Sequence, residues 1–586
     1  MTKAEKNNSG RDRIRWVTAA LAAASALGVM GPSQHAGAAA DARAYVTLSQ
    51  GWSDAERFAF YSQDQGSRIM PLAWMRALRT PEGEPFLADG LTRFGYLPND
   101  RSPHPDLPVG FLAAEDHGTT MVGMTCAACH TRQITAQGKS YRIDGGPALA
   151  NFQSFLTALD SAVAYALATP ATFQSFAQSV LGAPDPGPDA VAALRAEVEA
   201  WYQGFSTLTS RALPNPEWGA GRLDAITMIF NRLNGLDIGP PPSYLIPDNI
   251  QPANAPVRYP FLWNALVQDK TQWPGFADNG DDVLGLARNL GEAMGVFGTF
   301  HPVKDDSRIL GINYTVGSSF NFGGLLHLEQ SLRTLNPPKW PGPLDAALAT
   351  QGAAVFDQAC ASCHGIRPGT PRLLHTTWAT PVQNVGTDTR EWSILTRKVN
   401  PGVLTGAGLP GFKPPLSASE APIDVLALAV LGTIIDRARD NTVGADAPSS
   451  RLLAAVASDG LNANGELLKG AFRTRDTGAA KPGSYESRVL RGIWAAAPYL
   501  HNGSVPTLAD LLKPASQRPT SFKIGPAYDF NAVGLAQEQG GSATTLVTTD
   551  CSALDSGNSR CGHEFGVELS ARDKRALLEY LKTDMR

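Results

Sequence analysis

Two short cysteine motifs constrain this chain more than any other feature of its 586 residues. Cys126 to His130 reads Cys-Ala-Ala-Cys-His, and Cys360 to His364 reads Cys-Ala-Ser-Cys-His. Two thiols at this spacing can bond covalently to one haem, while the histidine that follows ligates the iron. A redox dithiol or a half zinc site would need a thioredoxin-like strand and helix or further ligands nearby, and neither is visible. The sequence therefore predicts two covalently bound haem c groups, held by Cys126, Cys129, His130, Cys360, Cys363 and His364.

The N-terminus has the three parts of a secretory signal. Five basic residues precede Val17, an apolar run of 14 residues extends to Met30, and small residues follow through Ala38. The run is too short to span a bilayer, so we expect residues 1–40 to be removed and the mature protein to be periplasmic or secreted, with no membrane span. Removal moves the formal charge from −4 to about −7, and this mildly acidic balance argues against nucleic acid as a partner.

Export also bears on the last two cysteines. Cys551 and Cys561 flank a polar loop, and two such thiols most often pair in an oxidising compartment. We therefore expect a disulfide, which would close about ten residues and contribute roughly 3 kcal/mol in the chain-entropy model.

Apolar residues at spacings of three and four predict helices at 149–166, 191–198, 344–359, 425–435 and 570–583. The 57 Gly and 43 Pro predict long loops, and the Pro-rich run 337–343 is the clearest boundary because it admits neither helix nor central strand. We therefore expect a mainly α fold of two cytochrome c-like haem domains, with long loops and few short strands. The N-terminal haem domain, with insertions, would cover residues 41–336, and the C-terminal cytochrome c-like haem domain residues 337–586.

The second haem needs a ligand on the face opposite His364, and the chain has no methionine between Met294 and Met585. His563 stands in the loop just before the C-terminal helix, where small c-type cytochromes supply their sixth ligand. The predicted disulfide would hold this loop. His501 is the alternative ligand, and a structural role is open for either histidine.

No residue is comparably placed to close the iron above His130. The candidates in the same half of the chain lie in apolar or Gly-rich contexts that favour packing: Met228, Met294, His301 and His327. An open iron binds dioxygen or peroxide, whereas two protein ligands favour electron transfer. Trp263 and Trp273 are candidates for packing near the haems or bridging them, with core packing as the alternative.

Together these features resemble the di-haem cytochrome c peroxidase superfamily. The resemblance rests on the two haem motifs and on residues 491–508, which read RGIWAAAPYLHNGSVPTL. Segments 332–341 and 557–566 are similar to the rubber oxygenase branch, whose secreted di-haem proteins cleave poly(cis-1,4-isoprene) with dioxygen. Ordinary peroxidases carry a methionine soon after the His-x-Gly-Ser motif, where this chain has Pro514 and Ala515, and this departure counts against a standard peroxidase.

In the rubber oxygenase branch the N-terminal haem binds dioxygen and the C-terminal haem has two histidines. The resemblance therefore implies His130 below an open iron, and His364 with His563 around a closed one. We expect a secreted di-haem oxidoreductase that activates dioxygen to cleave an apolar alkene such as polyisoprene. Two alternatives stay open: a peroxidase that reduces hydrogen peroxide with electrons from a small redox protein, and a pure electron-transfer cytochrome. The sequence nominates no acid or base for the reaction.

Overall fold

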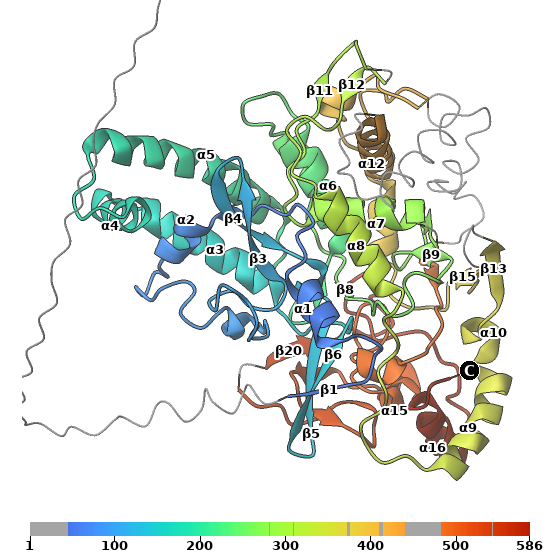
Figure 1. Ribbon diagram of the computed structural model, residues 1–586. Helices are drawn as coiled ribbons and strands as arrows, with labels where there is room; N and C mark the ends of the chain where they lie inside the picture. Colours follow the sequence, from blue (N-terminus) through green and yellow to red (C-terminus); the bar gives the residue numbers. More distant parts are fainter. Residues whose placement is uncertain are drawn as a thin grey trace, which may run out of the picture. The chain divides into compact units, whose positions relative to one another are not determined.

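The computed structural model describes residues 45–280, 282–308, 310–371, 376–409, 414–439, 482–541 and 543–585. Tyr45–Arg586 form one compact unit, drawn in Figure 1. The expected secretory signal, residues 1–40, lies outside the described residues. Within the described ranges, no helix combines the length and the apolar character needed to cross a membrane.

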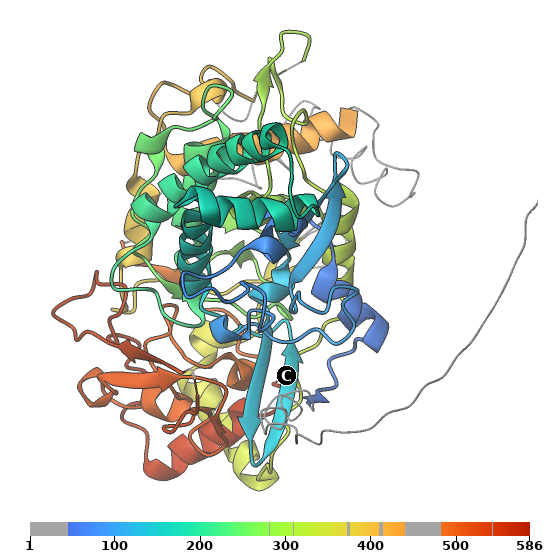
Figure 2. The same ribbon diagram turned by 90° about the vertical axis from the view of Figure 1, so that its left-hand side faces the viewer.

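Helices make up the larger part of the regular structure. Several of them begin at side chains that cap the first turn, such as Asn151 before α3 and Asp345 before α9. The helices are α1 (Asp54–Ser62), α2 (Leu72–Ala77), α3 (Phe152–Leu167), α4 (Pro170–Leu181), α5 (Pro188–Ala212), α6 (Ala225–Arg232), α7 (Asp282–Gly295), α8 (Phe322–Leu332), α9 (Ala346–Ala359), α10 (Ala361–His364), α11 (Arg390–Ser393), α12 (Pro422–Arg439), α15 (Leu508–Leu511) and α16 (Ala571–Leu581). Figure 2 shows α3, α4 and α5 grouped above the C-terminal segments drawn in orange and red.

The strands form nine small sheets within the described ranges. Two sheets have three strands, in the orders β1-β6-β5 and β2-β4-β3, and they contain β1 (Val46–Thr47), β2 (Met70–Pro71), β3 (Phe111–Asp116), β4 (Thr119–Met124), β5 (Thr131–Ala136) and β6 (Lys139–Asp144). The others are antiparallel pairs: β7 (Arg222–Leu223) with β8 (Val257–Arg258), β9 (Lys270–Thr271) with β10 (Ala277–Asp278), β11 (Val303–Lys304) with β12 (Ile312–Asn313), β13 (Pro368–Pro371) with β14 (Thr376–Trp378), β15 (Val382–Gln383) with β16 (Tyr485–Glu486), β17 (Ser521–Ile524) with β20 (Thr544–Val547), and β18 (Tyr528–Asp529) with β19 (Gly534–Leu535).

The prediction of a mainly α fold with two separate haem domains is wrong. The structure is 37% helix and 16% strand. One core cluster contains Phe60 and Ile143, from before the predicted boundary, together with Phe356, Trp494 and Leu577, from after it. Because side chains from both sides of residue 337 are buried against each other, the described chain does not divide into two independent haem domains.

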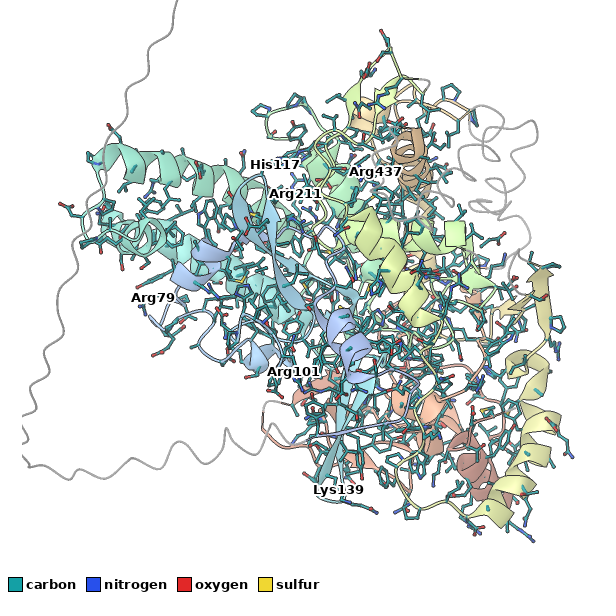
Figure 3. All side chains as sticks on the ribbon, in the orientation of Figure 1. Arg79, Arg101, His117, Lys139, Arg211 and Arg437 are labelled. Carbon is teal, nitrogen blue, oxygen red and sulfur yellow. A yellow bond between two sulfur atoms is a disulfide. The ribbon has the colours of Figure 1, made fainter. Side chains whose placement is uncertain are left out.

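The first cysteine motif lies in the short connection between two β-hairpins, which the sequence did not predict. His117 and Gly118 join β3 to β4 with φ of 47° and 82°, and Gln137 and Gly138 join β5 to β6 with φ of 50° and 74°. Two central residues with positive φ form the type I′ turn, whose twist matches that of the paired strands. The hairpins extend in opposite directions, as the positions of His117 and Lys139 show (Figure 3).

The second motif follows a helix, as predicted: Cys360 joins α9 to α10, and the rest of the motif forms α10. α9 packs against α16, and the two lie side by side at the lower right of Figure 1. A Cβ on Gly352 would lie only 1.9 Å from the carbonyl oxygen of Ala576, so this close crossing requires glycine. The predicted helices at 149–166, 191–198, 344–359, 425–435 and 570–583 are confirmed within α3, α5, α9, α12 and α16, with shifted bounds.

Candidate haem sites

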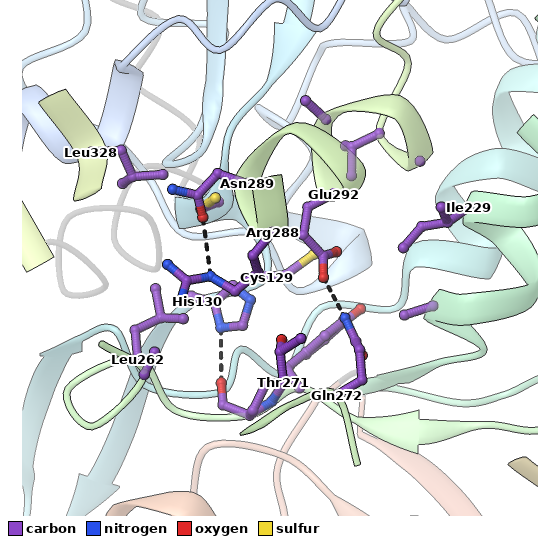
Figure 4. A pocket seen from close by; sticks show the side chains of 18 of the residues that line it. Cys129, His130, Ile229, Leu262, Thr271, Gln272, Arg288, Asn289, Glu292 and Leu328 are labelled. Atoms are coloured by element: carbon purple, nitrogen blue, oxygen red, sulfur yellow. Dashed lines mark hydrogen bonds between the residues drawn. The ribbon is translucent and has the colours of Figure 1, made fainter. Parts of the chain in front are cut away.

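The first motif adjoins a cavity of about 180 Å³. Its walls come from residues 259–273 and from helices α6, α7 and α8, and Figure 4 shows it from close by. Many of the lining side chains are apolar, such as Phe152, Met228 and Leu328. Among the described residues that line this cavity, His130 is the only histidine.

The second motif adjoins a separate cavity, also of about 180 Å³, which is lined by three histidines, His364, His501 and His563. The ring centres of His364 and His563 are 6.0 Å apart. Two imidazoles on opposite sides of one metal ion have centres about 6 Å apart, because each metal–nitrogen bond is about 2 Å long and each ring centre lies about 1 Å beyond its nitrogen. The spacing therefore fits one iron between His364 and His563.

Both motif histidines are oriented in the same way. The Nδ1 of His130 lies 2.8 Å from the carbonyl oxygen of Pro260, and the Nδ1 of His364 lies 2.8 Å from that of Arg488. A carbonyl only accepts, so Nδ1 carries the proton and donates it in both rings. This leaves Nε2 as the nitrogen with a free lone pair, which is how histidine ligates a metal with a backbone partner behind it.

The motif cysteines fit thioether attachment better than redox or metal chemistry. None of Cys126, Cys129, Cys360 and Cys363 forms a disulfide. Burial raises the pKa of the Cys126 and Cys129 thiols to about 12, so neither is a thiolate at neutral pH. No group of three or more His, Cys, Asp and Glu among the described residues is arranged to hold a metal ion by itself.

His501 also lines the second cavity, but its ring packs against another residue of the cavity wall. It stacks on Tyr485, with ring centres 3.9 Å apart and planes 22° apart. Burial and the nearby charge of Arg258 lower the pKa of His501 to about 3, so the ring stays neutral. The geometry therefore favours His563 over His501 as the partner of His364.

The loop that carries His563 is fixed at two points. The predicted disulfide between Cys551 and Cys561 is present, with Cα atoms 5.4 Å apart. The guanidinium of Arg518 donates to the carbonyl oxygens of Arg560 at 2.6 Å, Gly562 at 2.7 Å and His563 at 3.1 Å. These bonds hold the backbone on both sides of Gly562, so the position of the His563 ring is set by the fold.

The Cys551→Ser, Cys561→Ser double variant is expected to lose roughly 3 kcal/mol of unfolding free energy, because its unfolded chain is no longer closed into a loop. Urea unfolding of the purified protein measures the change. Wild-type protein treated with a reductant serves as the control and should unfold at the same urea concentration as the variant. An unchanged midpoint in the variant would contradict the expectation.

A polar pair that the sequence did not predict, Gln272 and Glu292, faces the first cavity. The side-chain amide of Gln272 donates to Glu292 Oε1, as drawn in Figure 4. Burial raises the pKa of Glu292 to about 7, although Arg288 and Gln272 act in the opposite direction. A carboxyl group that changes its protonation state near neutral pH can accept and release protons during a reaction.

Gln272 holds its place in the pair through an unusual backbone conformation. Its φ is 60°, in the left-handed region that residues other than glycine rarely adopt. Such conformations concentrate at functional sites, where the surrounding structure maintains them. Here the turn after β9 directs Gln272 to Glu292 and places the next residue, Trp273, between the two cavities.

The two tryptophans predicted to lie near the haems have different surroundings. Trp273 lines both cavities, and its ring centre lies 4.7 Å from the guanidinium carbon of Arg258 and 4.4 Å from that of Arg488. Trp263 lines neither cavity; its indole N–H donates to the carbonyl oxygen of Arg491 at 2.8 Å. Trp273 is therefore the residue placed to connect the two sites.

Comparisons with known proteins support the assignment of this chain as a cytochrome. The family described as RoxA-like, cytochrome c-like matches residues 484–523, which include Tyr485, Arg488 and His501. The uncharacterized protein y4iJ of Sinorhizobium fredii is 31% identical over 599 residues, and the match covers 92% of each chain. The chain belongs to the y4iJ family. A second protein of that bacterium, the uncharacterized protein y4iM, is 27% identical over 344 residues, which are 55% of this chain and 63% of y4iM.

The names of y4iJ and y4iM state no activity, but the RoxA-like match supports a haem cytochrome related to rubber oxygenase. A cytochrome c-like segment implies covalently bound haem c. The predicted relation to RoxA-like cytochromes is thus supported, whereas membership of the wider di-haem peroxidase superfamily and the number of haems stay predictions.

Proposed function

We propose that this protein is a di-haem c-type oxidoreductase that activates dioxygen above His130 and oxidises an apolar substrate. One observation carries the proposal: the cavity at the second motif pairs His364 with His563, whereas His130 is the only histidine that lines the cavity at the first motif in the described part of the chain. This difference favours a closed second iron and an open first iron, and an open haem iron binds and activates dioxygen or peroxide.

The walls of the first cavity suit an apolar substrate. Leu262, Leu328 and Leu332 lie on one side of it, and Met228 and Ile229 come from α6. Apolar walls hold an alkene, exclude water and so suppress competing polar reactions. Their role in the proposed reaction is to position the double bond, while the bound group supplies the redox chemistry.

The second cavity fits a supporting role in electron supply. Two histidine ligands leave no position for a substrate, and this favours electron transfer. Trp273 lines both cavities and offers an aromatic path between them. In the proposal, His364 and His563 would hold a haem that stores or relays an electron, and Trp273 would connect it to the first cavity, in a periplasmic or secreted protein as the N-terminal sequence predicts.

A specific observation favours a second candidate, the reduction of hydrogen peroxide. Hydrogen peroxide has to lose a proton from the oxygen atom that would bind the iron and gain one at the oxygen atom that leaves as water. Glu292 Oε1, held by the Gln272 amide and with a pKa of about 7, is suited to accept that first proton and return it. An alkene cleavage that keeps both oxygen atoms in the product does not require this step.

Absorption spectra of the purified protein test the proposal, taken as isolated, after dithionite, and after dithionite with carbon monoxide. We expect carbon monoxide to shift the spectrum of one haem of the two, because one iron has an open position. Two low-spin haems that are both inert to carbon monoxide would instead support the third possibility, a pure electron-transfer cytochrome.

A further inference from the structure

A third cavity, of about 40 Å³, lies on the far side of the Gln272–Glu292 pair from the first cavity. Five residues line both cavities: Ile229, Thr271, Gln272, Arg288 and Glu292. The hydrogen bond between Gln272 and Glu292 therefore lies in the wall that separates the small cavity from the space above His130. We call the small cavity the side cavity.

The remaining walls of the side cavity are largely apolar. They come from the facing surfaces of α7 and α12 and from the chain between β9 and β10, with Phe276, Leu284, Ala287, Gly291, Leu426 and Val430. The charged groups at its edge are paired, Asp278 with Lys270 and Arg288 with Glu329. Away from the Gln272–Glu292 pair, apolar walls of this kind take up small apolar guests such as xenon.

Gly291 leaves this space open. A Cβ added there would meet only Val430, at 3.9 Å, which is an ordinary contact. The other two glycines of α7 differ from Gly291. A Cβ at Gly285, near the start of the helix, would lie 2.1 Å from Glu329, and a Cβ at Gly295, at its end, would lie 2.4 Å from Ile229. Close neighbours thus require Gly285 and Gly295, whereas Gly291 weakens the helix without making room for a neighbour. The volume that its missing side chain would fill belongs to the side cavity.

We propose that the side cavity holds dioxygen on its way to the iron above His130, with the Gln272–Glu292 hydrogen bond as the gate between the two spaces. The inference rests on the proposed function, because it assumes an open iron in the first cavity. The size of the cavity suits a diatomic molecule and not an alkene chain, and its apolar walls favour dioxygen over hydrogen peroxide, which would lose its hydrogen bonds to water there.

Xenon tests the site without any reaction. Crystals of the haem-loaded protein under xenon pressure are expected to show one xenon atom between Gly291 and Val430. In the Gly291→Leu variant, the added side chain fills the space and the xenon atom should be absent. Gly291→Ala adds a single methyl group, should fold at least as well as wild type, and should reduce the xenon occupancy in part.

Carbon monoxide tests the route. After flash photolysis of the reduced, carbon monoxide-bound protein, the bimolecular association rate is expected to fall several-fold in Gly291→Leu and less in Gly291→Ala. Gly204→Ala is the matched control, because Gly204 lies inside α5, away from both cavities, and a Cβ there meets only Leu245 at 3.8 Å. Its association rate should equal that of wild type.

Two results would overturn the proposal: no xenon between Gly291 and Val430 in the wild-type crystal, or an association rate in Gly291→Leu equal to that of wild type. Failure of the proposed function looks different, because then carbon monoxide binds to neither iron in any variant. If only the side-cavity proposal is wrong, carbon monoxide still binds, and its association rate does not depend on the residue at position 291.

Discussion

His563→Ala is expected to convert the haem at the second motif from low-spin to high-spin, while His501→Ala leaves its spin state unchanged. The His563 ring centre lies 6.0 Å from that of His364, which is the spacing of two imidazoles on one iron. His501 instead stacks on Tyr485. Removing His563 therefore opens a coordination position, and the loop cannot supply another ligand because Arg518 holds its carbonyl groups.

Electron paramagnetic resonance of the oxidised variants measures this change, since the low-spin signal of one haem should disappear in His563→Ala. His501→Ala is the matched control, because it removes another imidazole that lines the same cavity. Loss of the low-spin signal in His501→Ala, with His563→Ala unaffected, would reverse the assignment of the ligand.

Glu292→Gln is expected to slow the reaction with hydrogen peroxide by about 10²- to 10⁴-fold, the usual contribution of a positioned acid–base group. Glutamine keeps the shape of the side chain but cannot accept the proton. In wild type the rate should rise as the pH increases through about 7, because the carboxylate that forms above the pKa of Glu292 is the proton acceptor. The rate of the variant should not depend on pH in this range.

Stopped-flow absorption on both sides of neutral pH measures these rates. Glu217→Gln is the control, since Glu217 is an exposed carboxylate that accepts a hydrogen bond from Ser154 and does not line the first cavity. Carbon monoxide binding should be the same in all three proteins. A Glu292→Gln variant that reacts with peroxide as fast as wild type would show that Glu292 is not the proton acceptor, and would remove the observation that favours peroxide reduction.

The sequence predicted the parts of the fold that depend on strong local patterns. The periodicity ahead of Cys360 gave α9, and the apolar faces at 425–435 and 570–583 gave α12 and α16. The disulfide followed from the compartment and the spacing of its cysteines. These features involve residues close together in the chain, which a sequence pattern can report.

The hairpins on either side of Cys126 were missed because their turns are atypical. Type I′ turns are recognised from Asn-Gly or Asp-Gly, whereas these turns are His117-Gly118 and Gln137-Gly138. The division into two domains failed for a different reason. The Pro-rich run at 337–343 does interrupt regular structure, but residues before and after it share one core, and no local pattern shows which distant segments pack together.

The candidate site was predicted where the motifs determine it and missed where the fold assembles it. Glu292 lies more than 160 positions after His130 on a helix with an ordinary pattern, and Gln272 reaches it only through a left-handed turn that the sequence does not reveal. Trp263 and Trp273 are ten residues apart and both are buried, yet only Trp273 lines the cavities. Tertiary packing decides between such candidates.

The hydrogen bonds of the motif histidines make each site depend on distant parts of the chain. The carbonyl groups that orient His130 and His364 belong to residues 130 and 124 positions further along the chain. Each motif histidine is therefore oriented only after a segment more than 120 residues away has packed beside it, so the motif supplies the attachment residues and the rest of the chain sets the direction of the ring.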